Sequence, residues 1–264
     1  MRLLHFDQSG RLCLTKDLSE DELSSYPYAI LSHTWGTDDE EMTFADLTQG
    51  SRHTEVKYEK LRFCGKQAAH DGLHYFWVDT CCIDKSSSAE LSKAITSMFR
   101  WYGGAVKCYV YLTDVSTRSI ESTYESAPSW EPAFRSSRWF KRGWTLQELL
   151  APRSVEFFDS EGTRLGDKKS LEQMLHDITK IPPQALRNAP LEEFSVEERM
   201  SWAQDRETKH LEDKAYSILG VFDVSMPLIY GEGEDKALDR LQREIQRGKC
   251  SSSALWLQKS WPLS

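Results

Sequence analysis

The stretch that decides the fold is Tyr75–Lys85, with the sequence YFWVDTCCIDK. Its first four residues are aromatic or β-branched, which is typical of a strand buried on both faces. We predict a strand over residues 75–83, with Asp79 and Asp84 placed where the apolar run gives way to polar residues. An apolar strand that ends in carboxylates and leads into a helix is how an open parallel sheet presents its ligand-binding edge. A single aspartate at such a place is more often a turn residue, so a site requires other side chains at the same edge.

A second short apolar run, Tyr28–Leu31, predicts another buried strand. Between the two strands, apolar residues of the segment 58–73 recur near helical spacing, and Gly72 is a plausible stop for that helix. A strand, a helix and a strand in this length form a βαβ unit, whose two strands are parallel and whose connection is right-handed.

Polar and aromatic residues follow the strand of Tyr28–Leu31 directly. They are Ser32, His33 and Trp35, and a parallel sheet would bring them to the edge that carries Asp79 and Asp84. Taken alone, His33 is more often a hydrogen-bonding loop residue than a catalyst, and Trp35 is more often a cap on the core. Their functional interpretation depends on their meeting the aspartates.

The rest of the pattern predicts an α/β fold. An N-terminal hairpin is expected over residues 1–15, and a helix that starts after Ser87 carries an apolar stripe as far as Tyr102. Strands are expected at Cys108–Leu112 and Val155–Phe158. Strands that alternate with helices indicate a mostly parallel sheet flanked by helices, in a doubly wound arrangement.

Three parts are expected along the chain: an α/β domain over residues 1–180 that includes the hairpin, a helical extension over 181–250 packed on it, and a tail over 251–264. The helix of residues 235–247 is expected to stop at Gly248. Residues 115–137 are polar and without a period, so we expect a long loop that is mobile or functional.

Composition limits the classes of function. The 264 residues carry a formal net charge of −8, an unfavourable balance for binding nucleic acid or an anionic membrane surface. No stretch approaches the length of a membrane span or a signal peptide. The six cysteines form neither a disulfide framework nor a zinc spacing, so we expect reduced thiols, a cytoplasmic location and no metal.

A cluster of cations precedes the helix that is expected to run as far as Leu150. Arg138, Lys141 and Arg142 lie just before Trp144 and Glu148, which are four residues apart and therefore share a helix face. Together with a helix N-terminus, these cations would bind an anion such as a phosphate. The alternative is a solvated basic turn with an exposed glutamate, because a Trp-x-x-x-Glu spacing alone is a weak pattern.

Taken together, these segments resemble a known family, the HET domain of fungal heterokaryon incompatibility proteins. The segments that carry the resemblance are Tyr28–Gly36, Tyr75–Lys85, Ser97–Tyr102, Cys108–Asp114 and Arg142–Pro152. The region from Glu212–Gly220 through Met226–Glu234 is similar to the segment that commonly follows this domain. The resemblance covers nearly the whole chain.

The resemblance implies a fold and a biological role. HET domains trigger programmed cell death when genetically different fungal cells fuse, and they are often joined to nucleotide-binding NACHT and repeat modules. They are considered distant relatives of Toll-type (TIR) domains, which have a flavodoxin-like sheet. Some TIR domains cleave NAD with a glutamate in a Trp-x-x-x-Glu setting, which makes Glu148 the candidate catalytic residue here. NAD or a related nucleotide is then the candidate substrate rather than a cofactor, and a homo-oligomer is the expected active form.

In this hypothesis the other polar residues of the edge hold the nucleotide. Trp144 or Trp35 would stack on a ring, Asp79 or Asp84 would accept hydrogen bonds from ribose or amide, and Arg142, with Arg138, would face the phosphates. The substrate-binding candidates are therefore Ser32, His33, Trp35, Asp79, Asp84, Arg138, Arg142 and Trp144.

Two alternatives remain open at the level of sequence. The chain would act as a self-associating death-signalling module without catalysis, with the same residues serving core and interface. Alternatively, Cys81 or Cys82 would act with His33 as a hydrolase, although a cysteine in an apolar strand is more often buried and inert.

Overall fold

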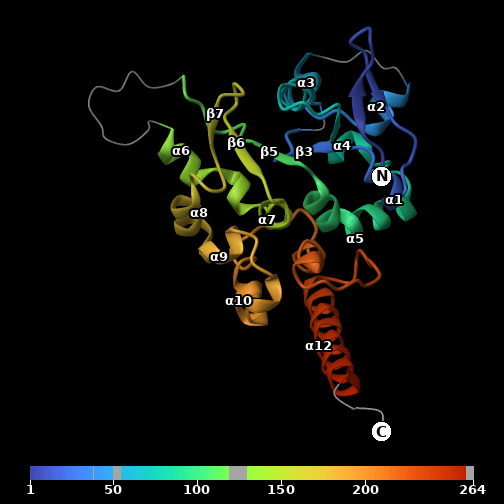
Figure 1. Cartoon of the computed structure of the whole chain (residues 1–264), viewed down its shortest axis with the longest axis vertical. Coiled ribbons are helices and arrows are strands. Elements are labelled where there is room, and N and C mark those ends of the chain that lie inside the picture. Colours follow the sequence, from blue (N-terminus) through green and yellow to red (C-terminus); the bar gives the residue numbers. More distant parts are fainter. Residues whose placement is uncertain (38, 50–54, 119–129, 260–264) are drawn as a thin grey trace.

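The chain folds around one mixed β-sheet with helices on both faces (Figure 1). The computed structural model describes residues 1–37, 39–49, 55–118 and 130–259, without the side chains of residues 55, 56 and 249–259. The strands, in chain order, are β1 (Leu4–Phe6), β2 (Leu12–Leu14), β3 (Tyr28–His33), β4 (Tyr75–Trp77), β5 (Lys107–Tyr111), β6 (Val155–Phe158) and β7 (Arg164–Asp167). Their order across the seven-stranded sheet is β2-β1-β4-β3-β5-β6-β7.

The helices of the first part of the chain are α1 (Glu20–Leu23), α2 (Phe44–Gln49), α3 (Glu55–His70), α4 (Asp79–Cys82), α5 (Ser88–Gly104), α6 (Glu131–Ser136), the 3₁₀ turn η1 (Arg138–Lys141) and α7 (Thr145–Leu150). Those of the last part are α8 (Glu172–Thr179), α9 (Pro183–Leu186), η2 (Leu191–Glu193), α10 (Val196–Ser201), α11 (Asp213–Tyr216), η3 (Leu219–Val221) and α12 (Glu234–Lys259). In the described part of the chain, no helix has both the length and the apolar character that crossing a membrane requires.

The centre of the sheet is parallel, as the alternation of elements predicts. β3 pairs with β4 on one side and with β5 on the other, and β5 pairs with β6, all in parallel. The predicted N-terminal hairpin forms and joins the sheet antiparallel to β4. The antiparallel strand β7 at the other end of the sheet was not predicted, because its sequence RLGD has no apolar run and only Gly166 is buried.

The strand predicted over residues 75–83 is shorter than expected. β4 stops at Trp77, and Asp79–Cys82 coil into the single helical turn α4. The apolar run continues past Trp77 because this turn is itself buried: Cys81 and Cys82 lie in the core although they are not in a strand. Asp79 therefore occupies the first position of a helical turn that follows the strand after one residue, Val78.

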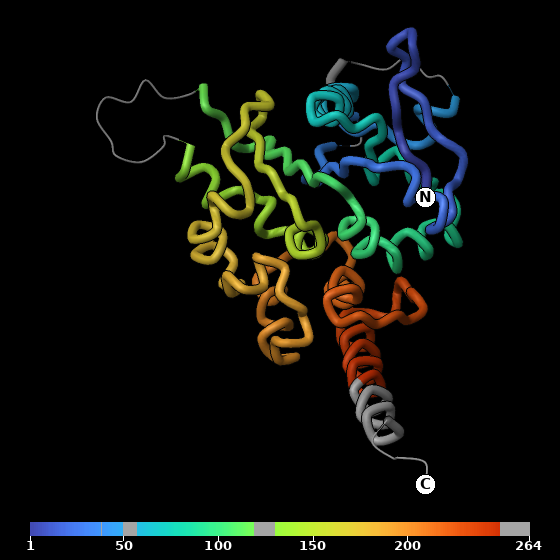
Figure 2. Tube along the Cα trace, in the orientation of Figure 1, coloured from blue at the N-terminus to red at the C-terminus, as the bar shows by residue number. Residues whose placement is uncertain are grey.

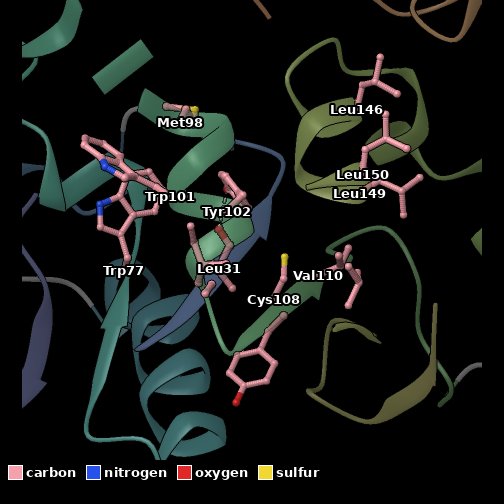
Figure 3. Close-up of a cluster of buried hydrophobic side chains, with 14 of the residues drawn as sticks. Leu31, Trp77, Met98, Trp101, Tyr102, Cys108, Val110, Leu146, Leu149 and Leu150 are labelled. Carbon is pink, nitrogen blue, oxygen red and sulfur yellow. Dashed lines mark hydrogen bonds between the residues drawn. The ribbon is translucent and has the colours of Figure 1, made fainter. Parts of the chain in front are cut away.

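Each face of the sheet is covered by different helices. α3 lies on one face, where Phe63 packs its ring against Tyr109, Tyr111 and Phe158. α5 and α7 cover the other face (Figure 1), and the hydroxyl of Tyr102 on α5 donates to the carbonyl of Leu31 at 3.0 Å. Figure 3 shows the core of that second face, in which the predicted apolar face of α7 is buried. The three leucines of that face are Leu146, Leu149 and Leu150.

The single helix expected before Pro152 is two elements. η1 ends at Lys141 and α7 begins at Thr145, with Gly143 in the break. A β-carbon on Gly143 would lie 2.5 Å from a methyl carbon of Thr208, so only glycine allows the C-terminal part of the chain to approach this closely. The break therefore serves the packing of a distant segment against α7.

The C-terminal part differs from the predicted helices in two places. The spacing of the apolar residues from Leu211 to Leu219 predicts one helix that ends near Gly220, but the structure has the two short turns α11 and η3 there, and Leu211 itself is 62% exposed. α12 runs through Gly248 to Lys259, so the backbone of most of the expected tail is helical, while residues 260–264 lie outside the described residues. Figure 2 shows α12 leading away from the sheet. Residues 119–129 of the predicted loop 115–137 also lie outside the described residues, while α6 occupies part of the remainder.

Candidate functional site

Two neighbouring elements bring Ser32 and Glu148 together at the carboxyl end of β3. The hydroxyl of Ser32 donates a hydrogen bond to Oε2 of Glu148, and the indole Nε1 of Trp139 donates to that hydroxyl at 2.9 Å. Both Ser32 and Glu148 are buried. The glutamate faces a cavity of about 310 Å³.

The position of this cavity follows from the topology. The chain passes from β3 to β4 on one side and then returns to place β5 on the other side of β3. Crevices at the carboxyl ends of strands, where the strand order reverses in this way, are the usual ligand sites of open α/β sheets.

The pKa of the Glu148 carboxyl group lies near neutral, so its charged and neutral forms are both populated at pH 7. Burial raises the pKa of its carboxyl group, and the negative charge of Asp79 acts in the same direction. Hydrogen bonds from Ser32 and Tyr102 and the charge of Arg142 oppose the shift, and the resulting pKa is about 7. A carboxyl group that titrates near neutral pH inside a cavity is a common property of catalytic acids and bases.

Trp35 and Asp79 meet at the wall of this cavity, as the parallel strands predict. The indole Nε1 of Trp35 donates to Oδ2 of Asp79 at 3.0 Å, and Nζ of Lys85 lies 3.7 Å from the same oxygen. Lys85 and Arg142 also place their cationic groups over the indole ring, at 3.7 and 4.8 Å from a ring centroid. The ring that was expected to stack on a nucleotide therefore contacts two cations here.

His33 lies in a buried polar cluster at one end of the cavity. Its Nε2 is 3.2 Å from Oε2 of Glu41, whose other oxygen accepts hydrogen bonds from Lys60 and from the backbone of Gly36. Burial works to raise the pKa of Glu41, but the hydrogen bonds and charges of His33 and Lys60 outweigh it and hold that pKa at about 2. The Nδ1 atom of His33 has no hydrogen-bond partner among the described residues, and His33 lines the cavity.

The C-terminal segment supplies a wall that was not predicted from the sequence. The carboxylate of Asp213 accepts hydrogen bonds from Nε1 of Trp144 at 3.2 Å and from the hydroxyl of Tyr230 at 2.9 Å. Burial raises the pKa of Asp213. His210 completes this wall with its ring 5.3 Å from that of Tyr230. The acidic pair that opens the segment Glu212–Gly220 was the one signal in the sequence for a carboxylate here.

Three predicted residues, Ser32, Asp84 and Arg138, do not line this cavity, and Ser32 is connected to it through its hydrogen bond to Glu148. Asp84 lines a second cavity of about 580 Å³, and Arg138 lines a third of about 300 Å³. The side chain of Arg138 donates to the hydroxyl of Thr113 at 2.9 Å. Trp35, Arg142 and Lys209 line all three cavities, so the three adjoin one another at these side chains.

The geometry does not support a cysteine nucleophile. Neither Cys81 nor Cys82 lines the cavity of His33, and each sulfur contacts a backbone group of Val78. Burial also raises the pKa of the Cys81 thiol far above its usual value, which disfavours the thiolate. Within the described residues, no group of three or more His, Cys, Asp or Glu side chains is arranged to hold a metal ion.

Comparisons with known proteins agree with the resemblance. Residues 28–133, from β3 to α6, match the family model described as heterokaryon incompatibility protein (HET). The chain is 57% identical over 245 residues to the vegetative incompatibility protein HET-E-1 of Podospora anserina, covering 93% of this chain and 18% of that protein. The chain thus spans about a fifth of the length of this curated relative. No solved structure gives a significant match. Residues 28–133 therefore carry the heterokaryon incompatibility (HET) domain, and the chain is similar over most of its length to one part of an incompatibility protein.

Proposed function

We propose that this chain is an effector module of heterokaryon incompatibility that cleaves the bond between ribose and nicotinamide in NAD or a related nucleotide, with Glu148 as the catalytic carboxylate. The observation that carries this proposal is the buried Glu148, hydrogen-bonded to Ser32 at the carboxyl end of a central parallel strand and facing a cavity. The incompatibility role is suggested by the name of the relative, vegetative incompatibility protein HET-E-1.

The chemistry is within reach of one carboxylate. When the bond between the ribose carbon and the ring nitrogen breaks, its electron pair neutralises the positive charge of the pyridinium ring. The leaving group therefore requires no general acid, unlike the leaving group of the two-carboxylate glycosidases. An anion beside the oxocarbenium-like carbon stabilises the developing charge, and water then adds to that carbon and gives up a proton. Glu148 is placed to provide the anion and to accept this proton.

The remaining candidates have compatible positions. Trp144 lines the cavity beside Asp213, and Arg142 reaches it from the break before α7. The order of the four parallel strands, β4-β3-β5-β6, agrees with a flavodoxin-like sheet of the TIR kind, in which the first strand lies between the second and the third. This agreement supports the proposed relation to TIR domains.

The direct test is the Glu148→Gln variant, assayed for release of nicotinamide from NAD at high protein concentration. We expect at least a hundredfold loss of turnover with an unchanged circular dichroism spectrum, because the amide cannot provide the anion. The same substitution at the exposed Glu193 is the control, since Glu193 lies outside the cavity. If Glu148→Gln releases nicotinamide at the rate of the wild type, the proposal is wrong.

The proposal also fixes a pH dependence. The catalytic form of Glu148 is the anion, and its pKa is about 7. The rate of nicotinamide release at saturating NAD should therefore rise about tenfold per pH unit below 7 and level off above it. A rate that does not change between pH 5.5 and 8 would mean that the ionisation of Glu148 does not control the reaction. The catalytic role would then belong to another group.

A specific observation also favours the non-enzymatic alternative. Leu211, Ile229 and Tyr230 are 62%, 48% and 42% exposed, and all three belong to the C-terminal segment. Exposed apolar side chains gathered in one segment are typical of an interaction surface. Cell death caused by the Glu148→Gln variant, together with loss of both killing and self-association in Leu211→Ser, would favour a module that signals by self-association.

A further inference from the structure

We propose that the ligand of the Glu148 cavity is a dinucleotide whose diphosphate is bound by Arg142 and Lys209 and whose second nucleoside occupies the adjoining cavity beside Asp84. This inference rests on the proposed function and specifies its substrate class. It gives a binding role to Lys209, in the C-terminal segment, and to a cavity that the reaction itself does not require.

The first argument is charge. Arg142 and Lys209 line the junction of the cavities, and neither forms an ion pair within 4.0 Å in the part of the chain that the structure describes. Lys85, at the same junction, shares its charge with Asp79 at a distance of 3.7 Å. Arg142 acts on Glu148 only through its charge, without an ion pair, and in a chain with a net charge of −8 two cations left without an ion pair at a cavity wall indicate an anionic ligand. Arg142 also presents a planar donor group suited to phosphate oxygens.

The second argument is the division of charge along the cavities. On one side of the junction lie the carboxylates of Asp79, Glu148 and Asp213, in the first cavity, and on the other side lie those of Glu41 and Asp84, in the second. A ligand that matches both regions carries a cationic or electron-poor ring at the carboxylates and a phosphate group at the junction. A nucleotide with a pyridinium ring has these charges in this order, and its diphosphate would then leave the first cavity at Arg142.

The third argument is size and the chemistry of the second cavity. The first cavity, of about 310 Å³, is at the lower limit for a whole ligand, whereas the second adds about 580 Å³. The second cavity presents the aromatic ring of Trp35 and the carboxylate of Asp84. Oδ1 of Asp84 accepts from the backbone and hydroxyl of Ser86, at 3.0 and 2.6 Å, which fixes the carboxylate in place. Asp84 follows the turn α4 beyond the carboxyl end of β4, and carboxylates beyond the carboxyl ends of parallel strands are frequent acceptors for ribose hydroxyls.

The third cavity is the competing path for the ligand. It is lined by Arg138, Lys141, Arg142 and Lys209, with Glu207 as its one carboxylate. We favour the second cavity because it has the larger volume and contains an acceptor for ribose, whereas the third consists mainly of charged side chains. Lys141 lines only the third cavity, so it distinguishes the two paths.

The test is the binding of ADP-ribose, the diphosphate-linked product, to the whole chain by isothermal titration calorimetry. We expect Lys209→Ala and Asp84→Asn each to weaken binding about tenfold, the effect of one charge-assisted hydrogen bond. Lys141→Ala and the charge-matched control Lys236→Ala, an exposed residue of α12, should leave binding within about twofold of the wild type. Ribose 5-phosphate, which lacks the second nucleoside, should bind wild type and Asp84→Asn equally.

The outcomes separate this inference from the proposed function. If Lys141→Ala weakens ADP-ribose binding and Asp84→Asn does not, the ligand occupies the third cavity and the inference is wrong. Failure of the wild type to bind ADP-ribose would also overturn the inference. Nicotinamide release from NAD is measured in parallel on the wild type. If nicotinamide is not released but the variants change ADP-ribose binding as expected, the proposed reaction is wrong and the dinucleotide site is supported. If nicotinamide is released but no variant changes ADP-ribose binding, the reaction is supported and the dinucleotide site is wrong.

Discussion

At the scale of single residues, the burial of Glu148 makes folding stability depend on pH. The pKa of this group is raised from 4.5 to about 7 in the folded chain, so the folded state binds the proton more tightly than the unfolded state. The resulting stabilisation is complete below pH 4.5 and is lost as the pH rises through 7. Full ionisation of the buried group costs on the order of 3 kcal/mol.

This linkage predicts a difference between the wild type and Glu148→Gln in urea unfolding. The stability of the wild type relative to the variant should fall by roughly 3 kcal/mol between pH 5 and pH 8, because only the wild type ionises a buried group in that window. Comparing the two proteins at each pH cancels the titration of all other groups. A constant difference across the range would mean that the carboxylate is already ionised at pH 5, contrary to the buried environment.

Several residues of the site could be predicted because parallel strands end at one edge. Trp35 follows β3 and Asp79 follows β4, and the sheet brings both to one cavity wall with Glu148, to which Ser32 near the end of β3 donates a hydrogen bond. Asp213 could not be predicted, because its place in the wall depends on the packing of a segment far along the chain. No local periodicity records that packing.

At the scale of elements, the break between η1 and α7 is shaped by a close contact. The backbone N–H of Gly143 donates to the carbonyl of Glu207 at 2.8 Å, and the N–H of Glu207 donates back to the carbonyl of Lys141 at 2.5 Å. This pair of bonds draws Thr208 onto Gly143, where a β-carbon would lie 2.5 Å from the threonine methyl carbon. The wall formed by Thr208–His210 is thus positioned by the absence of a side chain at residue 143.

Gly143→Ala should therefore destabilise the fold by about 1–3 kcal/mol, the usual cost of overpacking. The matched control is Gly103→Ala in α5, where the nearest atom to the added carbon is 3.6 Å away and alanine favours the helix by about 0.5–1 kcal/mol. Thermal unfolding followed by circular dichroism measures both. Equal melting temperatures for the two variants would show that Thr208 yields without cost, and the tight approach would then have no role in holding the wall.

Elements with a strong period could be predicted and those shaped by tertiary contacts could not. The apolar stripe of α5 and the alternation around β3 and β5 reflect burial that repeats along the element. By contrast, β4 looks longer in sequence than it is because α4 is also buried, and a run of apolar residues does not distinguish a buried turn from a strand. Likewise, the spacing of apolar residues in the sequence does not show that the expected helix divides into α11 and η3.

At the scale of the whole molecule, the C-terminal part is joined to the α/β part by buried polar contacts. The side chain of Arg206 is buried and donates to the carbonyl of Arg142 at 3.0 Å and to the hydroxyl of Thr145 at 2.8 Å, while its Nε donates to the carbonyl of Trp202 at 3.2 Å. Burial lowers the pKa of Arg206 to about 10, with the charge of Glu148 opposing the shift, so the guanidinium remains charged at neutral pH. A buried cation that donates these three hydrogen bonds links the two parts of the chain.

Because of this link, we expect residues 1–180 and 181–250, the two parts indicated by the sequence, to unfold together. Urea unfolding should give coincident transitions by tryptophan fluorescence and by far-ultraviolet circular dichroism. Arg206→Met should shift both curves together by about 1–3 kcal/mol, because the carbonyl of Trp202 loses its side-chain donor and the carbonyl of Arg142 keeps only the hydroxyl of Thr145. The control is Arg243→Met in α12, whose exposed ion pair with Asp239 contributes less than about 1 kcal/mol. Two separate transitions, with Arg206→Met moving one of them alone, would mean that the C-terminal part folds as an independent unit. In that case the wall that carries Asp213 and Lys209 would be able to leave the site while the α/β part stays folded.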